Sequence, residues 1–113
     1  MKSLEGEGYR IDFDPDQQRI TLEGSLRLSG LSEYAPVSEM LEAGLEQSFL
    51  EIDLSGLEFL NSSGIATLSK FVIAARNRGD TALRIRGSND IPWQGKSLNN
   101  LKRLMPALEL TFD

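Results

Sequence analysis

Two adjacent serines, Ser62 and Ser63, are the residues of this 113-residue chain whose types and position best suggest a chemical role. They follow an apolar stretch and precede a helical pattern that includes Ile65, so both hydroxyls are predicted at a helix N-terminus. Unpaired backbone N–H groups and the positive end of the helix dipole favour an anion there. The turn therefore suits a phosphate, either bound or covalently attached. The simpler alternative is that these serines only cap the helix, which stabilises it by about 1 kcal/mol.

Composition limits the other chemistries. The chain contains no histidine and no cysteine, which excludes Ser-His-Asp catalysis, histidine-based zinc sites, disulfides and thiolate chemistry. Asp53 and Glu58 flank the turn, but two carboxylates are too few for a closed metal site. We expect Asp53 to cap a strand end and Glu58 to face solvent. Gly56 and Gly64 do not form a phosphate-binding loop, because the Gly-Lys-Ser/Thr ending is missing. We therefore expect no enzymatic activity, no metal and no cofactor.

The elements that position the serines follow from the periodicity of apolar residues. Alternating patterns predict strands, of which the first two form an antiparallel hairpin; the predicted strands are residues 9–14, 19–26, 49–54, 82–86 and 108–112. Helical spacing predicts three helices. The first begins near Ser32 or Glu33, the second runs from about Ser63 to Arg78, and the third runs from Ser97 to Met105. Residues 1–8 are rich in Gly and Glu and are expected to be frayed.

The resulting fold class is α/β. The order ββαβαβαβ predicts a mixed, mostly parallel sheet with right-handed crossovers and helices mainly on one face. The length of the chain suits one domain, residues 1–113.

Charge is distributed unevenly along the chain. Residues 1–60 carry 4 basic and 13 acidic side chains, whereas residues 61–113 carry 8 basic and 4 acidic ones. The acidic half argues against nonspecific nucleic-acid binding. Either the charges pair across the fold, or a polarised surface steers a charged protein partner. No apolar run is long enough to span a membrane, and the first residues lack the apolar core of a secretory signal. We therefore expect no membrane association and a cytoplasmic location.

The stretch Phe49–Leu57, followed by Phe59–Ile65, resembles the STAS domain of bacterial anti-sigma-factor antagonists. The hallmark of that family is an aspartate-rich strand ending, a hydrophobic spacer, and an Asp-Ser-Ser-Gly or Asp-Ser-Thr-Gly turn. Its element order is also the order predicted here, so the resemblance covers nearly the whole chain. It implies a single STAS-like domain.

The resemblance also implies a function. In that family the serine after the acidic position is the usual phosphorylation site, which corresponds to Ser62 here. A histidine-kinase-like serine kinase, often also the anti-sigma factor, phosphorylates it with ATP, and a PP2C-like phosphatase removes the phosphate. Only the unmodified form binds the partner well. The implied function is a phosphorylation-controlled protein-binding module in bacterial signal transduction. This chain differs by having Asn61 at the acidic position, so its side chain carries no charge.

The expected partner surface covers the serine turn, the second helix and the neighbouring loops. Its residues are Asp53, Ser55, Asn61, Ser62, Ser63, Gly64, Ile65, Gly24 and Ser25. Two alternatives remain open: a nonphosphorylated STAS scaffold, which Asn61 favours, and a small-ligand sensor for a nucleotide or lipid. Trp93 is interpreted either as a lid over the edge of the core or as an anchor at an interface.

Overall fold

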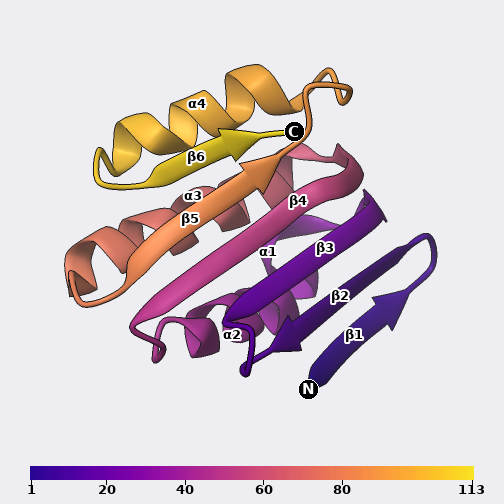
Figure 1. The fold of residues 1–113 in the computed structure, drawn as a ribbon. Helices are drawn as coiled ribbons and strands as arrows, with labels where there is room; N and C mark the ends of the chain where they lie inside the picture. The colour runs from indigo at the N-terminus through magenta and orange to yellow at the C-terminus, as the bar shows by residue number, and fades with distance from the viewer.

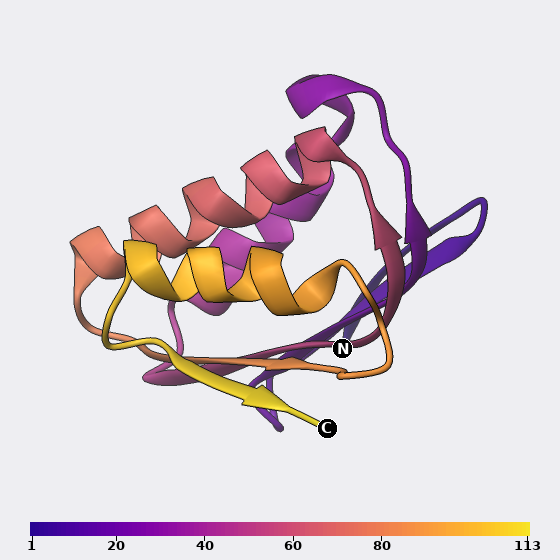
Figure 2. The same cartoon turned by 90° about the horizontal axis from the view of Figure 1, so that it is seen from above.

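A six-stranded mixed sheet with all helices on one face makes up the computed structural model, which describes residues 1–113 (Figures 1 and 2). Its strands lie in sequence order and are β1 (Lys2–Gly6), β2 (Tyr9–Asp14), β3 (Arg19–Leu26), β4 (Phe49–Leu60), β5 (Ala82–Gly87) and β6 (Glu109–Phe112). The first two pairings are antiparallel and the next three are parallel. Right-handed crossovers that always add a strand to the same edge place every helix on the same face.

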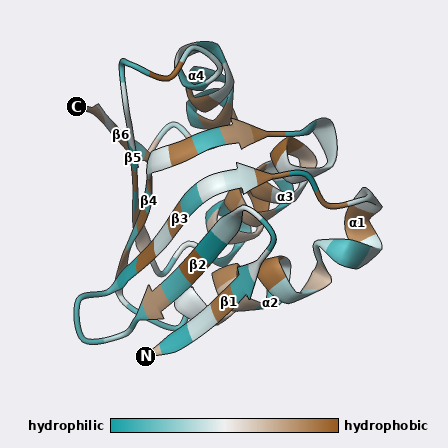
Figure 3. Cartoon of the chain, turned by 90° about the vertical axis from the view of Figure 1, so that its right-hand side faces the viewer, coloured by the Kyte–Doolittle hydropathy of each residue, from teal (hydrophilic) through white to brown (hydrophobic).

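The helices cover the apolar face of the sheet. They are α1 (Gly30–Glu33), α2 (Ala35–Gly44), α3 (Ser62–Arg78) and α4 (Gln94–Leu104). Alternate strand residues point toward them and are fully or almost fully buried, as the brown bands along the strands in Figure 3 illustrate. These core residues include Ile11, Ile20, Leu22, Leu50, Ile52, Leu54 and Ile85. None of the helices is both long and apolar enough to cross a membrane.

The opposite face of the sheet carries a row of ion pairs. Glu51 Oε2 lies 2.7 Å from Arg19 Nε, and Glu51 Oε1 lies 3.3 Å from Arg84 Nη1. Arg84 also contacts Glu109 at 3.0 Å, so the row spans β3 to β6. The two arginines reduce the exposure of Glu51 to 6 %, although no helix covers this face. Charged side chains therefore shield Glu51 from water at the centre of the face that no helix covers.

The N-terminal residues are not frayed as expected. Lys2–Gly6 forms β1, which pairs with β2 in a regular antiparallel ladder. Arg10 contributes to this pairing by binding Glu5 at 3.2 Å and Asp12 at 3.0 Å. Only the Arg10–Glu5 pair crosses between the two strands, and it adds to the backbone ladder that makes this Gly- and Glu-rich segment an edge strand. The observed order gains one strand relative to the prediction.

Three other boundaries differ from the prediction. The strand predicted at residues 49–54 continues to Leu60, because register shifts against β3 let it stay paired while it bends. The first predicted helix is split into α1 and α2 near Pro36, which has no backbone N–H to continue α1. The last helix begins at Gln94 instead of Ser97. The second predicted helix is confirmed, and it ends at Gly79, whose φ of 73° suits glycine.

Candidate functional site

The turn between β4 and α3 is built around the side chain of Asn61. Its Oδ1 accepts hydrogen bonds from the backbone N–H of Gly64 at 3.0 Å and from the hydroxyl of Tyr34 at 2.6 Å. Its Nδ2 donates to the carbonyl oxygen of Leu28 at 2.8 Å. Asn61 is therefore the N-cap of α3 and also ties that helix to the loop after β3 and to the junction between α1 and α2.

Tyr34 is the buried partner that orients this amide. Only 1 % of its surface is exposed, and burial raises the pKa of its hydroxyl above the ordinary value of 10.0. The phenol therefore remains protonated and acts as a hydrogen-bond donor at neutral pH. The direction of the amide is fixed by the Gly64 N–H, which can only donate and therefore faces the oxygen of Asn61.

The side chains of the two serines do not contribute hydrogen bonds to the fold. Neither the Ser62 nor the Ser63 hydroxyl forms a hydrogen bond, because Asn61 provides the cap. The interpretation of the serines as the capping residues is therefore wrong for this turn. Ser62 is the first residue of α3 and is exposed, whereas Ser63 is half-buried. The hydroxyl of Ser62 thus lies at the surface, at the positive end of a 17-residue helix.

Gly64 and Ile65 lie deeper in the turn. Gly64 is buried, and a Cβ at this position would strike the side chain of Leu60 and approach the Tyr34 hydroxyl to 2.7 Å. Ile65 is half-buried, and its backbone N–H donates to the Asn61 carbonyl at 3.0 Å to begin the helix. A larger residue here would therefore require the ends of the Leu60 and Tyr34 side chains to shift.

Gly24 and Ser25 lie next to the turn, at the end of β3. Ser25 pairs with Phe59 in the parallel register, and its N–H donates to Gly8 in the β1–β2 turn at 2.8 Å. Gly24 has a φ of 91°, and a Cβ there would collide with the Gly8 carbonyl. The absence of a side chain lets the β1–β2 turn fold against β3.

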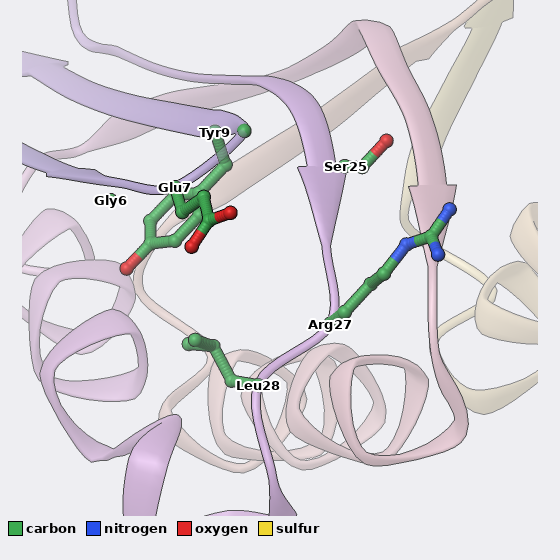
Figure 4. A pocket seen from close by; sticks show the side chains of 7 residues that line it. Gly6, Glu7, Tyr9, Ser25, Arg27 and Leu28 are labelled. Atoms are coloured by element: carbon green, nitrogen blue, oxygen red, sulfur yellow. The ribbon is translucent and has the colours of Figure 1, made fainter.

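A shallow cleft of about 520 Å³ opens between that turn and the end of β3 (Figure 4). Ser25, Tyr9, Glu7 and Leu28 line it together with Arg27, whose guanidinium points away from the Glu7 carboxylate. The Arg27 guanidinium lies 4.5 Å from the centre of the Phe59 ring. Leu28 connects this cleft to the turn, because it lines the cleft and its carbonyl accepts a hydrogen bond from Asn61. The stacked pair of Arg27 and Phe59 lies next to it.

Asp53 and Ser55 are not brought to the turn. Asp53 lies within β4 and not at its end, so the expected strand-end cap is wrong. Its Oδ1 accepts from the N–H and hydroxyl of Ser55 at 2.9 and 2.6 Å, where the register with β3 shifts. Seven residues separate Asp53 from Leu60, which is roughly 20 Å along a strand. Glu58 is exposed, as expected, and no cluster of acidic residues suitable for a metal ion is present.

Gln94 is an organising residue that the sequence analysis missed. It is fully buried, and its Nε2 donates to the carbonyls of Leu54 and Leu57 at 2.6 and 3.0 Å. Its Oε1 accepts from the N–H of Ser88 at 2.7 Å. Trp93 packs on the core and donates from Nε1 to Leu57 at 3.1 Å, which supports its interpretation as a lid. Together they satisfy the carbonyls that the irregular part of β4 frees.

These features define a class of protein: a small α/β domain with a one-sided sheet and an exposed serine at the start of its longest helix. A model of the family described as "Mlab, STAS domain" matches residues 9–106, so the chain belongs to the STAS family. No curated protein matches the chain in sequence.

Solved structures agree with this assignment at the level of the fold. Apo-SiaC from Pseudomonas aeruginosa is 18 % identical with a TM-score of 0.72, covering 100 % of this chain and 99 % of that one. A second structure of SiaC from P. aeruginosa is 19 % identical with a TM-score of 0.69, covering 99 % of this chain and 96 % of that one. An anti-sigma factor antagonist from Mycobacterium paratuberculosis is 20 % identical with a TM-score of 0.55, covering 96 % and 82 %. The STAS-like fold inferred from the sequence is confirmed.

Proposed function

We propose that this STAS domain is a phosphorylation-controlled protein-binding module that is switched at Ser62. The unmodified form binds a cytoplasmic partner, a histidine-kinase-like ATPase that acts as serine kinase or anti-sigma factor. Phosphorylation of Ser62 weakens this binding, and a PP2C-like phosphatase restores it. The domain itself has no catalytic role.

The single observation that carries the proposal is the free hydroxyl of Ser62. Asn61 caps α3, so the Ser62 hydroxyl makes no internal hydrogen bond and is exposed on the first residue of the helix. Modification would therefore break no contact of the fold. The helix N-terminus tolerates the added negative charge, since the dipole favours an anion there.

The covalent step is a phosphoryl transfer. The γ-phosphoryl group moves from ATP to Ser62 Oγ as the bond between the γ-phosphorus and the β,γ-bridging oxygen breaks and ADP leaves. The hydroxyl proton passes to a base of the kinase. The product adds a charge of about −1.5 to −2 to the docking surface. A partner surface packed there without cations loses affinity through repulsion and desolvation.

The partner is proposed to contact the exposed part of the turn and the end of β3. Ser62, Ser63 and Ser25 lie on this surface, while Asn61, Gly64 and Ile65 support it from beneath. The proposed contacts at Asp53 and Ser55 lie farther along β4, so they require a partner whose footprint extends roughly 20 Å.

The test begins with a histidine-kinase-like ATPase from the same genome, sought first among the genes next to the one that encodes this protein. After incubation with ATP and Mg²⁺, intact-mass measurement should show one added phosphoryl group on the wild type and on Ser63→Ala, but none on Ser62→Ala. Binding titrations should then give similar affinities for the wild type and Ser62→Ala and a weaker affinity for Ser62→Asp. Equal affinities for all three proteins would contradict the switch.

A nonphosphorylated STAS scaffold is the second candidate. The observation that favours it is that all three hydrogen bonds of the Asn61 side chain are used within the fold. Both acceptor positions of Asn61 Oδ1 are thus occupied, so this atom is not available to accept from the Ser62 hydroxyl and orient it toward a phosphoryl donor. A partner that binds the wild type tightly but leaves its mass unchanged under phosphorylating conditions would favour the scaffold.

A further inference from the structure

Arg27 is the only arginine in the structure that forms neither a hydrogen bond nor an ion pair. The other seven arginines each contact an acidic group, a carbonyl or an amide; they are Arg10, Arg19, Arg76, Arg78, Arg84, Arg86 and Arg103. The guanidinium of Arg27 instead stacks on the ring of Phe59, which is 40 % exposed. All five N–H donors of this side chain are therefore available to an anion.

The strand register places Arg27 close to the residue that precedes Ser62. Leu26 and Leu60 are paired, and the N–H of Asn61 donates to the carbonyl of Leu26 at 3.3 Å. The amide of Asn61 also donates to Leu28, so Arg27 lies between two residues bonded to the neighbour of Ser62. One strand spacing plus one residue puts the Cα atoms of Arg27 and Ser62 within about 9 Å. Extended arginine and phosphoserine side chains can bridge that gap.

Arg27 is also the only basic residue in the segments that form this turn, namely the end of β3, the loop and helices after it, and the end of β4 with the start of α3. No other Lys or Arg occurs between Arg19 and Lys70, and Lys70 lies eight residues along α3, about 12 Å from its start. The acidic groups of the surrounding elements are Glu7 of the β1–β2 turn, Glu33 of α1 and Glu58 of β4. Within the segments that form the turn, Arg27 is therefore the one cation that can attract an anion.

We infer that Arg27 binds the phosphate of phosphorylated Ser62 within the same molecule. To do so, its guanidinium moves away from the ring of Phe59. This inference rests on the proposed modification of Ser62. An exposed arginine–aromatic stack is a weak interaction. A guanidinium and a phosphate form two parallel charge-assisted hydrogen bonds, each stronger than a neutral hydrogen bond. The guanidinium therefore binds the phosphate in preference to stacking on the Phe59 ring.

This exchange changes the docking surface in two places at once. The phosphate occupies the Arg27 donors, so a partner carboxylate that used them loses its contact. The ring of Phe59 loses its cation and becomes more exposed. Phosphorylation would then remove a favourable contact as well as add a repulsive charge, without moving α3.

The test needs no kinase, because phosphoserine can be installed at position 62 during translation. We expect ³¹P NMR titration to give a second phosphate pKa about half a unit or more lower in the wild type than in Arg27→Gln. The δ-methylene protons of Arg27 should resonate upfield in the unmodified protein, since they face the Phe59 ring, and lose that shift on modification. Phe59→Leu supplies the reference shift without a ring.

The matched control is Arg103→Gln, which removes the same charge at the far end of the helices. Arg103 precedes Leu104, whose carbonyl binds Arg76, and Arg76 lies 14 residues from Ser62 on α3, about 20 Å away. The phosphate pKa should not change in this variant. Identical phosphate pKa values in the wild type and Arg27→Gln, with unchanged Arg27 resonances, would overturn the inference. That outcome would leave the kinase reaction at Ser62 untouched, whereas failure of the kinase assay would not affect the chemistry measured here.

Discussion

Asn61 fits its position because the turn requires both an acceptor and a donor from one side chain. Oδ1 faces the N–H of Gly64 and the hydroxyl of Tyr34, while Nδ2 faces the carbonyl of Leu28. An aspartate could accept from the first two groups but would place a second oxygen against the third. The replacement of the family's acidic residue is therefore explained by the loop after β3.

Replacing Asn61 with aspartate should destabilise the protein. The carboxylate would lie against the Leu28 carbonyl at the 2.8 Å now spanned by a hydrogen bond. We expect a loss of about 1–3 kcal/mol in the free energy of unfolding, measured by urea denaturation. An Asn61→Asp protein as stable as the wild type would show that Leu28 moves aside and does not select the amide.

The serines should behave in the opposite way. Since neither hydroxyl is bonded within the fold, Ser62→Ala and Ser63→Ala should each change the free energy of unfolding by less than about 0.5 kcal/mol. Asn61→Ala, the matched variant that removes the real cap, should cost about 1 kcal/mol or more. A loss of similar size in Ser62→Ala would mean that its hydroxyl is engaged in the fold.

Tyr34→Phe should lower stability and change its response to alkaline pH. The variant loses the hydrogen bond to Asn61, which we expect to cost about 1 kcal/mol at neutral pH. In the wild type the pKa of Tyr34 is raised above 10.0, so the unfolded chain ionises first. The stabilising contribution is complete below that pH and is lost as pH rises toward the folded-state pKa. Urea denaturation at increasing pH should thus show a shallower alkaline decline in Tyr34→Phe; parallel declines would contradict this role.

At the scale of elements, β4 and α4 depend on each other. The register of β4 shifts twice against β3, and these irregularities turn the carbonyls of Leu54 and Leu57 away from the ladder. Gln94 and Trp93, at the start of α4, supply the missing donors. The bent strand that leads to the serine turn is therefore held by a helix 40 residues further along the chain.

Gln94→Leu should be the most damaging of these changes. It keeps a buried side chain of similar size but leaves the Leu54 carbonyl and the Ser88 N–H without their side-chain partner, while the Leu57 carbonyl keeps the bond from Trp93. At about 1–3 kcal/mol for each unsatisfied group, we expect a total loss of roughly 3 kcal/mol or more. Trp93→Phe, which loses only the bond to Leu57, should cost about 1 kcal/mol in the same denaturation experiment. Equal stability of Gln94→Leu and the wild type would indicate that water replaces the amide.

This dependence shows where sequence reasoning succeeds and where it ends. The alternation in β2, β3 and β5 and the helical spacing of α3 are local, so they predict those elements directly. Gln94 was missed because its partners are carbonyls released by β4, which no local pattern reveals. Likewise, asparagine is a recognisable cap residue, but its partner Tyr34 lies 27 residues away.

At the scale of the whole molecule, the uneven charge of the sequence becomes a feature of two faces. On the open face of the sheet, the arginines of β3 and β5 pair with acidic residues. The pairs are Arg19 with Glu51, Arg84 with Glu109, and Arg86 with Asp113. On the solvent side of α2 and just after its end, Glu39, Glu42 and Glu46 are exposed and form no ion pair. Charges thus pair across the fold on the open face of the sheet, whereas these three glutamates stay unpaired on the helical side.

Because the fold does not depend on the Ser62 hydroxyl, phosphorylation should leave the whole molecule intact and slightly more stable. An anion in the first turn of a helix contributes about 0.3–1 kcal/mol, which corresponds to a rise of a few degrees in the melting temperature of a domain of this size. Differential scanning calorimetry of the protein with phosphoserine at position 62 should show this rise, and added salt should reduce it by screening.

The NMR chemical shifts of the backbone amides should change only at the end of β3, the end of β4 and the first turn of α3. A lower melting temperature, or shifts spread through α4 and β6, would mean that phosphate acts by disturbing the fold instead of by altering one surface.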